Sequence, residues 1–298
     1  MDFFQNDYQR GTGHGADWCV EIQPPTRPVK TYWEEIKLVC GAVYEQRTAP
    51  LQLCLSGGLD SEYVLATLLD LGIPVEVVIM NTQYNAHETR YAYKFCENRN
   101  ITPTQVDLDF DWFVESGTMI EIAQASCCSA WQLAANMWLA SQLTGTVVTG
   151  DDPPHLIYNE KDHLWYLEED EIGYSHITWW KQKNISGTPF MLKYNAESML
   201  SFLTDPVIVQ LATNQMPGKL GSNSSKVHVF NRGSNYNLEQ RVKQHGYEMV
   251  EKAKIFNHAD IQTIIGWKDK WNGVSRHPYH DLVQCMSTGQ VSKAFDWK

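Results

Sequence analysis

Short apolar runs alternate with amphipathic segments along the first half of the chain. Four runs are short enough to be strands that are buried on both faces: residues 51–55, 75–80, 104–108 and 146–149. Three segments between them space their apolar positions three and four residues apart, as helices do: residues 61–71, 86–98 and 126–143. This alternation predicts an α/β fold, a parallel twisted sheet with helices on both faces. Ligands of such sheets bind beyond the carboxyl ends of the strands.

The two ends of the chain follow other patterns. Residues 1–30 are polar and interrupted by Gly and Pro, which predicts an extended arm. Residues 31–47 have helical spacing, and Thr31 and Glu34 stand at the spacing of a capping box. Beyond residue 152, four segments have helical patterns and predict an extension that packs on the sheet: residues 196–202, 206–215, 237–253 and 258–270.

These differences divide the chain into three parts. We expect an N-terminal arm and helix (residues 1–47), an α/β core (48–152) and a mainly helical region for the acceptor substrate (153–298). Within the third part, the acidic run Glu168–Glu171 predicts a solvated loop. The Gly, Ser and Asn content of residues 216–233 predicts a long loop.

Composition and charge narrow the class of protein. Hydrophobic residues make up 43% and charged residues 20%, as in an ordinary globular protein. The net charge of −11 argues against a broad basic face for nucleic acid or anionic lipid. Seven Cys without a C-x-x-C pair favour reduced thiols in a cytoplasmic protein over a zinc ribbon or a disulfide scaffold. We expect neither a signal peptide nor a membrane span.

The most informative segment is S-G-G-L-D-S at residues 56–61, directly after an apolar run and before a helix. Amides at a helix start point outward with partial positive charge and bind anions. Two glycines remove side chains that would hold a phosphate away, and the hydroxyls of Ser56 and Ser61 can donate to it. Asp60 repels a bare phosphate, but suits a site where Mg²⁺ bridges carboxylate and phosphate. The Walker pattern of kinases and GTPases is absent.

In this context the segment resembles the signature S-G-G-x-D-S of the PP-loop ATP pyrophosphatases, or adenine nucleotide alpha hydrolases. The variant looks most like the synthetase domain of asparagine synthetases and β-lactam synthetases. The resemblance implies a fold of the HUP/PP-loop type and implies that ATP and Mg²⁺ are bound. It also implies cleavage of ATP between the α- and β-phosphates, with adenylation of a substrate. It covers residues 48–152 and is faint beyond them.

The resemblance assigns roles to residues of this chain. The nucleotide-binding positions are Leu55, Ser56, Gly57, Gly58, Asp60, Ser61, Met80 and Gly150. The segment V-V-T-G-D-D at residues 147–152 stands where asparagine synthetases have a second acidic motif, so Asp60 with Asp151 or Asp152 would hold Mg²⁺. The motif departs from the family because Pro153 and Pro154 follow it. A helix cap or a loop acid is the alternative for the two aspartates.

Charge that develops on the α-phosphate needs a cation besides Mg²⁺. The candidates in the second half are Lys193, Lys219, Lys226, Lys254, Lys268, Lys270, Arg232 and Arg276. Lys219 and Lys226 lie in the predicted long loop, which could close over the phosphates. Lys268 and Lys270 lie where synthetase-type members supply a catalytic Lys, and we assign them that role beside Asp60. Residues 276–281 echo the R-x-P-F-L-D segment of asparagine synthetases, which a helix start explains equally well.

These features predict an AMP-forming ligase. A substrate oxygen, on a small molecule or a nucleotide, is adenylated with release of pyrophosphate and is then displaced by ammonia or an amine. The chain begins Met1-Asp2, without the Cys that glutamine-dependent members carry after the initiator Met. The nitrogen is therefore expected as free ammonia, from an amine substrate, or from a separate donor chain.

Two alternatives stay open. A sulfurtransferase acting on a nucleotide or RNA would use Cys127 or Cys128, the one neighbouring pair of cysteines. Adjacent residues of a helix point in different directions, which favours burial over catalysis for this pair. A nucleotide-binding protein that has lost turnover is the other alternative, and its 11 Trp are compatible with core packing or with contacts in a homo-oligomer.

Overall fold

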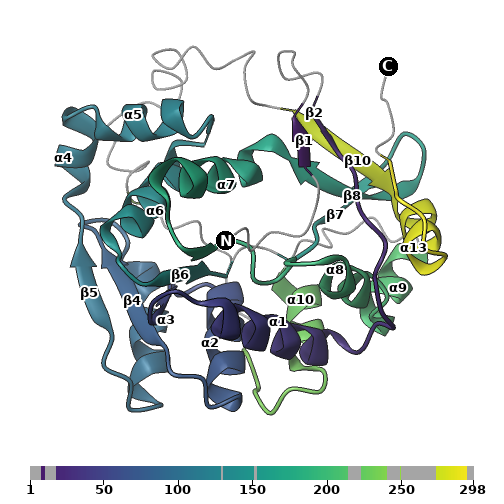
Figure 1. The fold of residues 1–298 in the computed structure, drawn as a ribbon, viewed down its shortest axis with the longest axis horizontal. Helices are drawn as coiled ribbons and strands as arrows, with labels where there is room; N and C mark the ends of the chain where they lie inside the picture. The colour runs from purple at the N-terminus through teal and green to yellow at the C-terminus, as the bar shows by residue number, and fades with distance from the viewer. Residues whose placement is uncertain are drawn as a thin grey trace.

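A parallel sheet with helices packed around it forms the larger part of the molecule, and a smaller sheet lies beside it (Figure 1). The computed structural model describes residues 8–10, 18–128, 130–150, 153–213, 223–239, 249 and 273–293. Among the helices in these ranges, none has both the length and the apolar character needed to cross a bilayer.

Five parallel strands form the central sheet in the order β5-β4-β3-β6-β9. They are β3 (Leu51–Cys54), β4 (Glu76–Asn81), β5 (Thr104–Asp107), β6 (Thr146–Thr149) and β9 (Gly187–Thr188). The chain moves outward from β3 through β4 to β5 and then returns to the other side of β3 as β6. A doubly wound sheet binds ligands where this direction reverses, which here is between β3 and β6. The α/β fold and its four predicted strands are confirmed, and β9 is added.

The two faces of the sheet carry different helices. Leu53 and Val148 point into a core shared with α1 (Tyr32–Gln46), α2 (Leu59–Asp70) and α3 (Ala86–Glu97). Their neighbours Cys54 and Val147 pack on the opposite face, against α4 (Phe110–Glu115), α5 (Thr118–Ala125) and α6 (Trp131–Gln142). This alternation follows from the two-residue period of a strand. Helices on both faces are thus confirmed.

Local signals set several helix ends where they were predicted. The capping box of α1 is formed: the Thr31 hydroxyl accepts from the Glu34 amide at 3.4 Å, and the Glu34 carboxylate accepts from the Thr31 amide at 3.1 Å. The single helix predicted over residues 126–143 was wrong, because α5 ends at Ala125 and α6 begins at Trp131. Cys127 between them has a φ of 56°, which no right-handed helix allows.

The second half contains strands that periodicity did not reveal. β7 (Leu156–Asn159), β8 (Leu164–Asp170) and β10 (Val274–Pro278) form an antiparallel sheet in the order β10-β8-β7. The acidic run is not a solvated loop, because β8 ends in it and α7 (Glu171–Lys183) begins in it. Glu169 and Glu171 are only 2% and 6% exposed. That prediction failed because the partners that bury these charges come from distant parts of the sequence.

Helices complete the extension. α8 (Ala196–Leu203) and α9 (Pro206–Thr213) confirm two predictions, whereas α10 (Asn223–Asn231) replaces part of the predicted long loop. α13 (Tyr279–Ser287) follows β10 directly. The segments predicted as helices at 237–253 and 258–270 lie almost wholly outside the described residues.

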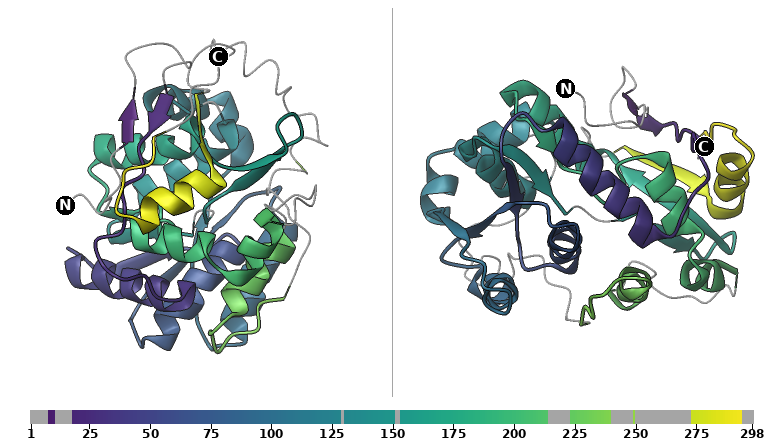
Figure 2. Two further views of the ribbon diagram at one scale, coloured as in Figure 1. Left: turned by 90° about the vertical axis from the view of Figure 1, so that its right-hand side faces the viewer. Right: turned by 60° about the horizontal axis from the view of Figure 1, so that its bottom comes forward.

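The N-terminal arm returns to the second sheet. β1 (Tyr8–Arg10) pairs with β2 (Trp18–Val20), and β2 lies beside β10 (Figure 2). The Val20 amide donates to the Ser275 hydroxyl at 3.0 Å. Trp33, Leu53 and Met199, one from each of the three predicted parts, belong to the same hydrophobic core. The boundaries between residues 1–47, 48–152 and 153–298 are not tested by this packing and stay a prediction.

Candidate phosphate-binding site

The predicted phosphate loop lies at the carboxyl end of the central strand β3. The Leu55 amide donates to the Val78 carbonyl at 2.8 Å, which extends the pairing with β4 one residue past the strand. The loop then turns into α2 at Leu59. Because β3 has parallel neighbours on both sides, its end opens at the switch point of the sheet. The sequence placed this loop correctly.

Hydrogen bonds between the two serines fix the shape of the loop. The hydroxyls of Ser56 and Ser61 lie 3.2 Å apart, and the Ser61 hydroxyl donates to the Gly58 carbonyl at 3.1 Å. The Gly58 amide donates to the Ser56 hydroxyl at 3.1 Å. Gly58 is the N-cap residue of α2, and no side chain caps the helix there. The first turn of α2 therefore presents its positive end to a ligand.

Two glycines allow neighbouring backbone to approach the loop. Gly57 has a φ of +93°, and a Cβ on it would lie 2.4 Å from the Glu88 carbonyl oxygen of α3. A Cβ on Gly150, just after β6, would lie 2.4 Å from both the amide nitrogen and the Cα of Ser61. Gly150 therefore packs directly on the start of α2. The predicted role of Gly150 in nucleotide binding stays a prediction.

Among the residues that the structure describes, Lys226 brings a cation to the loop. Its Nζ lies 2.6 Å from Oδ2 of Asp60, and the two side chains are only 8% and 14% exposed. Lys226 is one of the eight candidate cations of the sequence, and it stands in the first turns of α10 rather than in the predicted long loop. No local signal singles it out, because Asp60 lies 166 residues earlier in the chain.

Aromatic rings hold α10 in this position. The rings of Phe230 and Tyr63 stack with centroids 4.2 Å apart and planes 4° from parallel. The Tyr32 ring lies nearly parallel to both, and its hydroxyl donates to the Leu192 carbonyl at 2.9 Å. Burial, with the nearby Tyr63 and Asp60, holds the pKa of Tyr32 well above its ordinary value, so this hydroxyl stays protonated. Lys226 is thus carried on a packed helix.

The predicted metal site lies only partly within the residues that the structure describes. Asp60 lies at the loop as predicted, but Asp151 and Asp152 lie outside the described residues. Across the part of the chain that the structure describes, no three His, Cys, Asp or Glu side chains gather as a metal site. The oxygen donors of Asp60, Ser56 and Ser61 suit Mg²⁺ chemically. The assignment of Asp151 or Asp152 as a second ligand stays a prediction.

Met80 lies on the strand next to the loop, near the end of β4. Its side chain is half-buried against the second core, and its carbonyl accepts from the Asn85 side chain at 2.9 Å. The neighbouring Asn81 side chain accepts from the Tyr93 hydroxyl and donates toward Asp107, at 2.8 and 3.2 Å. The role of Met80 in binding adenine is untested by these contacts and stays a prediction.

The other predicted cations are either placed elsewhere or not described. Lys219, Lys254, Lys268 and Lys270 lie outside the described residues, so the catalytic role assigned to Lys268 and Lys270 stays a prediction. The remaining three each contact an acid: Lys193 with Glu169 at 2.6 Å, Arg232 with Asp205 at 3.0 Å and Arg276 with Glu168 at 2.7 Å. The last pair belongs to β10 and β8, and α13 begins at Tyr279, three residues after Arg276, as the helix-start alternative for residues 276–281 anticipated.

The neighbouring cysteines have different surroundings. Cys128 is fully buried, and burial raises the pKa of its thiol to about 11. Its sulfur lies 3.2 Å from the Ala130 carbonyl. Cys127 is half-buried in the left-handed conformation. The Cys128 thiol is therefore a poor nucleophile at neutral pH, because the reactive form is the thiolate and little of it is present.

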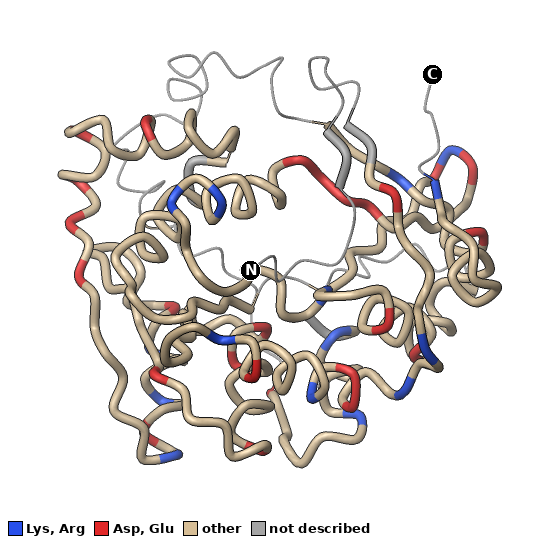
Figure 3. The backbone as a smooth tube through the Cα atoms, in the orientation of Figure 1, with Lys and Arg blue, Asp and Glu red and all other residues tan. Residues whose placement is uncertain are grey.

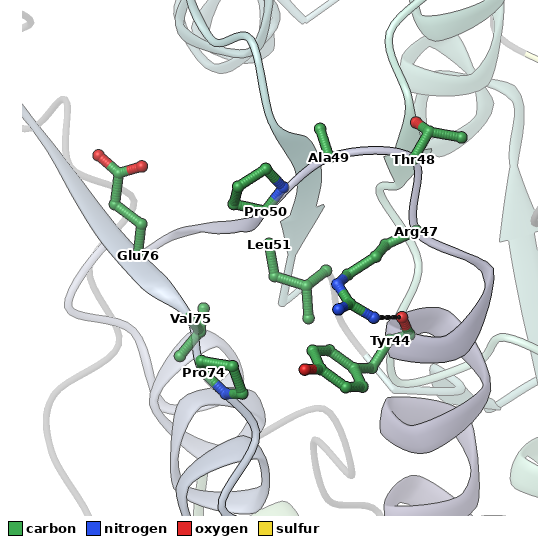
Figure 4. A pocket seen from close by; sticks show the side chains of 9 residues that line it. All are labelled: Tyr44, Arg47, Thr48, Ala49, Pro50, Leu51, Pro74, Val75 and Glu76. Carbon is green, nitrogen blue, oxygen red and sulfur yellow. Dashed lines mark hydrogen bonds between the residues drawn. The ribbon is translucent and has the colours of Figure 1, made fainter.

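A shallow groove lies at the opposite end of the central sheet from the loop (Figure 4). Its volume is about 680 Å³, and it is lined by the end of α1 and the starts of β3 and β4. The Arg47 guanidinium lies 3.6 Å from the centre of the Tyr44 ring in this groove. Doubly wound sheets bind their ligands at the carboxyl edge, whereas this groove is at the amino edge.

No protein-family model and no curated protein matches the amino-acid sequence. Solved structures do match. The NH3-dependent NAD synthetase of Campylobacter jejuni aligns at 18% identity over 40% of this chain and 57% of its own, with a TM-score of 0.29. The NMN synthetase of Francisella tularensis aligns at 14% identity over 72% of this chain and 97% of its own, with a TM-score of 0.33.

A predicted subunit of tRNA methyltransferase from Methanocaldococcus jannaschii aligns at 13% identity over 51% of this chain and 72% of its own, with a TM-score of 0.30. The likeness to these three proteins is distant and concerns the fold, which by itself does not fix an activity. The expected closeness to asparagine synthetases stays a prediction.

Proposed function

We propose that this protein is an ATP-dependent, AMP-forming ligase. It transfers AMP from ATP to a substrate oxygen, preferably that of a carboxylate, and releases pyrophosphate. It then joins the activated acyl group to ammonia or an amine. The observation that carries the proposal is the contact of Lys226 with Asp60 beside the uncapped start of α2. It adds a buried cation to a loop that already has the composition of a phosphate site.

The loop residues fit a polyphosphate chain. The uncapped amides at the start of α2 are donors for phosphate oxygens. The hydroxyls of Ser56 and Ser61 contact each other in the loop, and each can rotate to donate to a bound phosphate. A Cβ on Gly58 would lie 3.3 Å from the Ser56 hydroxyl, so a longer side chain at this position would enter the space beside the donors. The glycine keeps that space for a ligand.

Asp60 and Lys226 divide the charge of the reaction. Of the predicted Mg²⁺ ligands, Asp60 is the one within the residues that the structure describes. A bound Mg²⁺ would neutralise charge on the phosphate oxygens. If Asp60 binds a metal ion, its ion pair with Lys226 weakens, and the Lys226 ammonium can turn to the phosphates. There it offsets the negative charge that the departing pyrophosphate gains as the bond between the α-phosphorus and its bridging oxygen breaks. A preorganised cation of this kind is worth more in a water-poor site.

A product assay tests the proposal. Purified protein is incubated with ATP, Mg²⁺ and a panel of carboxylates, with and without ammonium or primary amines, and the nucleotide products are separated. We expect AMP and pyrophosphate, together with exchange of labelled pyrophosphate into ATP when the right carboxylate is present. Formation of ADP and phosphate instead would overturn the assignment.

The variant Asp60→Ala separates this proposal from a protein that binds nucleotide without turnover. The ligase loses AMP formation in the variant, because the carboxylate that would hold the metal is gone. Contaminating activity would survive the change, since it does not depend on this residue. Absence of AMP from the wild-type protein with every carboxylate of the panel would favour the non-catalytic alternative.

A further inference from the structure

A buried ion pair lies outside the phosphate loop. Lys193 stands in the connection between β9 and α8, and Glu169 near the end of β8. The Lys193 Nζ lies 2.6 Å from Oε2 of Glu169, and the two side chains are 13% and 2% exposed. Withdrawing two charges from water costs free energy that their attraction often fails to return. A role in function therefore explains this buried ion pair better than a contribution to folding stability does.

The surroundings of the Lys193 ammonium are those of a site that binds cations. Its Nζ lies 5.1 Å from the centre of the Phe190 ring and 5.5 Å from the centre of the Tyr174 ring. The Tyr174 hydroxyl donates to the same carboxylate oxygen of Glu169 at 3.0 Å. One oriented carboxylate and two aromatic rings are the groups that recognise a primary ammonium ion. Lys193 supplies such an ion from the chain itself.

This cluster adjoins the phosphate loop through the backbone. Phe190 forms an antiparallel bridge with Gly150, the residue that packs on the backbone of Asp60 and Ser61. Two residues beyond Phe190, the Leu192 carbonyl is held by the Tyr32 hydroxyl. The segment from Phe190 to Lys193 therefore leads from the phosphate loop to Glu169. In the tube view, the acidic run at the end of β8 and the start of α7 is a continuous red stretch across from the helices that flank the loop (Figure 3).

From this geometry we infer that Glu169, with the rings of Tyr174 and Phe190, is the binding site for the primary ammonium group of the acceptor. Lys193 is the resident occupant, and the acceptor displaces its ammonium. This role in ligation rests on the proposed function, whereas the binding of an ammonium ion does not. It narrows the acceptor to ammonia or a primary amine, because a bulkier quaternary group cannot replace the hydrogen bond to Glu169.

Glu169 also serves the chemistry of the second step. A primary ammonium has no lone pair, so it gives one proton to the Glu169 carboxylate before it reacts. The neutral nitrogen then forms the C–N bond to the acyl carbon. The C–O bond to the AMP phosphate breaks, its electron pair leaves with AMP, and the second nitrogen proton passes to water. Atoms and charge balance without any redox partner.

Binding of a simple amine tests the site without any turnover. The probe is n-propylammonium chloride, titrated by calorimetry against sodium chloride and tetramethylammonium chloride at equal ionic strength. The variant Lys193→Ala removes the resident ammonium, so we expect it to bind n-propylammonium at least tenfold more tightly than the wild type does. Adding the substitution Glu169→Gln to the Lys193→Ala variant should abolish this gain in affinity. Equal binding with and without Glu169, or no gain in Lys193→Ala, would overturn the inference.

The chain offers a matched control on the same strand. Glu168 is the neighbour of Glu169 and pairs with Arg276 at 2.7 Å, at a more exposed position. Neighbouring residues of a strand point to opposite faces, so Glu168→Gln makes the same chemical change away from the proposed site. We expect it to leave n-propylammonium binding within twofold of its parent. A loss as large as that in Glu169→Gln would mean that the effect is one of strand stability.

A second measurement separates this inference from the proposed function and does not depend on the Lys193 variant. With the carboxylate that supports pyrophosphate exchange, Glu169→Gln should leave exchange within twofold and raise KM for a primary amine at least tenfold. Hydroxylamine is uncharged at neutral pH and keeps its lone pair, so it needs no proton transfer to Glu169 before it attacks, and it should react equally well with both proteins. Equal losses in exchange and in the amine step would overturn the inference. Failure of exchange in the wild type would overturn the ligase alone, because the binding experiment still decides the ammonium site.

Discussion

The phosphate loop and the ammonium site, defined by Glu169, Tyr174, Phe190 and Lys193, are neighbouring regions that the chain builds in different ways. The loop consists of six consecutive residues, and its geometry comes from backbone amides, two hydroxyls and the absence of side chains. The ammonium site takes a strand residue, a helix residue and a connecting segment, and its geometry comes from side chains.

This difference teaches how each region fails. Backbone contacts cannot move aside, so the loop tolerates no added atom where Gly57 and Gly150 approach their neighbours. Side-chain contacts have alternatives, so the ammonium site can exchange one cation for another. Lys226 combines both kinds of contact, because it is a side chain from a distant helix that contacts Asp60 in a loop shaped by backbone contacts.

The largest effect is expected from Lys226→Met, which keeps the length of the side chain and removes its charge. If the cation offsets charge on the departing pyrophosphate, kcat for AMP formation should fall about 10²–10³-fold. ATP binding should weaken much less, because the charge develops during the reaction. Steady-state kinetics of AMP release measures both. This change tests whether a residue supplied by tertiary structure matters as much as the loop itself.

Lys37→Met is the matched control for this change. Lys37 also forms a contact with an aspartate, Asp70 at 2.7 Å, but on α1 and α2 away from the loop, and it is a third exposed. Exposed pairs contribute little, so AMP formation should stay within twofold of the wild type. If both variants lost activity equally, general destabilisation would explain the result and the role of Lys226 would be refuted.

Backbone packing at the loop is tested next by Gly150→Ala. The new Cβ would lie 2.4 Å from the Ser61 amide nitrogen and 2.6 Å from the Asp60 carbonyl carbon, neither of which can rotate away. We expect a loss of about 3 kcal/mol in the free energy of unfolding and weaker ATP binding. Urea denaturation followed by circular dichroism measures the first, and calorimetry the second.

Gly41→Ala makes the same substitution with the opposite expectation. Gly41 lies within α1, and a Cβ there meets nothing within 4 Å. Because alanine favours the helix, the variant should be more stable by about 0.5–1 kcal/mol. Loss of stability in both variants would contradict the packing argument.

Acid is expected to destabilise the second half through its buried histidines. His176 on α7 and His277 on β10 are buried, and burial lowers the pKa of each from 6.5 to about 4. The unfolded chain therefore binds these protons first, so stability falls as pH drops from about 6.5 toward 4. The loss at pH 5 is about 2 kcal/mol for each histidine.

Urea denaturation at pH 7 and pH 5 measures this loss. The variant His277→Gln retains a polar partner for the Ser292 hydroxyl, which lies 2.9 Å from the histidine ring, and removes one titrating group. Its loss between the two pH values should be smaller by about 2 kcal/mol. An unchanged loss would show that His277 does not titrate on unfolding.

Prediction from the sequence succeeded where one local pattern sufficed. Strands β3, β4, β5 and β6, helices α1, α2 and α3 and the loop at residues 56–61 were found, because each is encoded by consecutive residues. Helices α4 and α5 were not predicted. Prediction failed at Glu168–Glu171, because Glu168 pairs with Arg276 and Glu169 with Lys193, which lie farther along the chain. It also failed at residues 126–130, where Cys127 interrupts an otherwise helical pattern with a left-handed turn.

By itself, the sequence determined the alternation of strands and helices and the position of the glycine turn at residues 56–61, since periodicity and glycine act over a few neighbouring residues. Only the tertiary structure decided which cation reaches Asp60 and which acid faces the Lys193 ammonium. These contacts join residues 166 and 24 positions apart. Such pairings depend on how helices and sheets pack, and packing is set by the whole core rather than by any one segment.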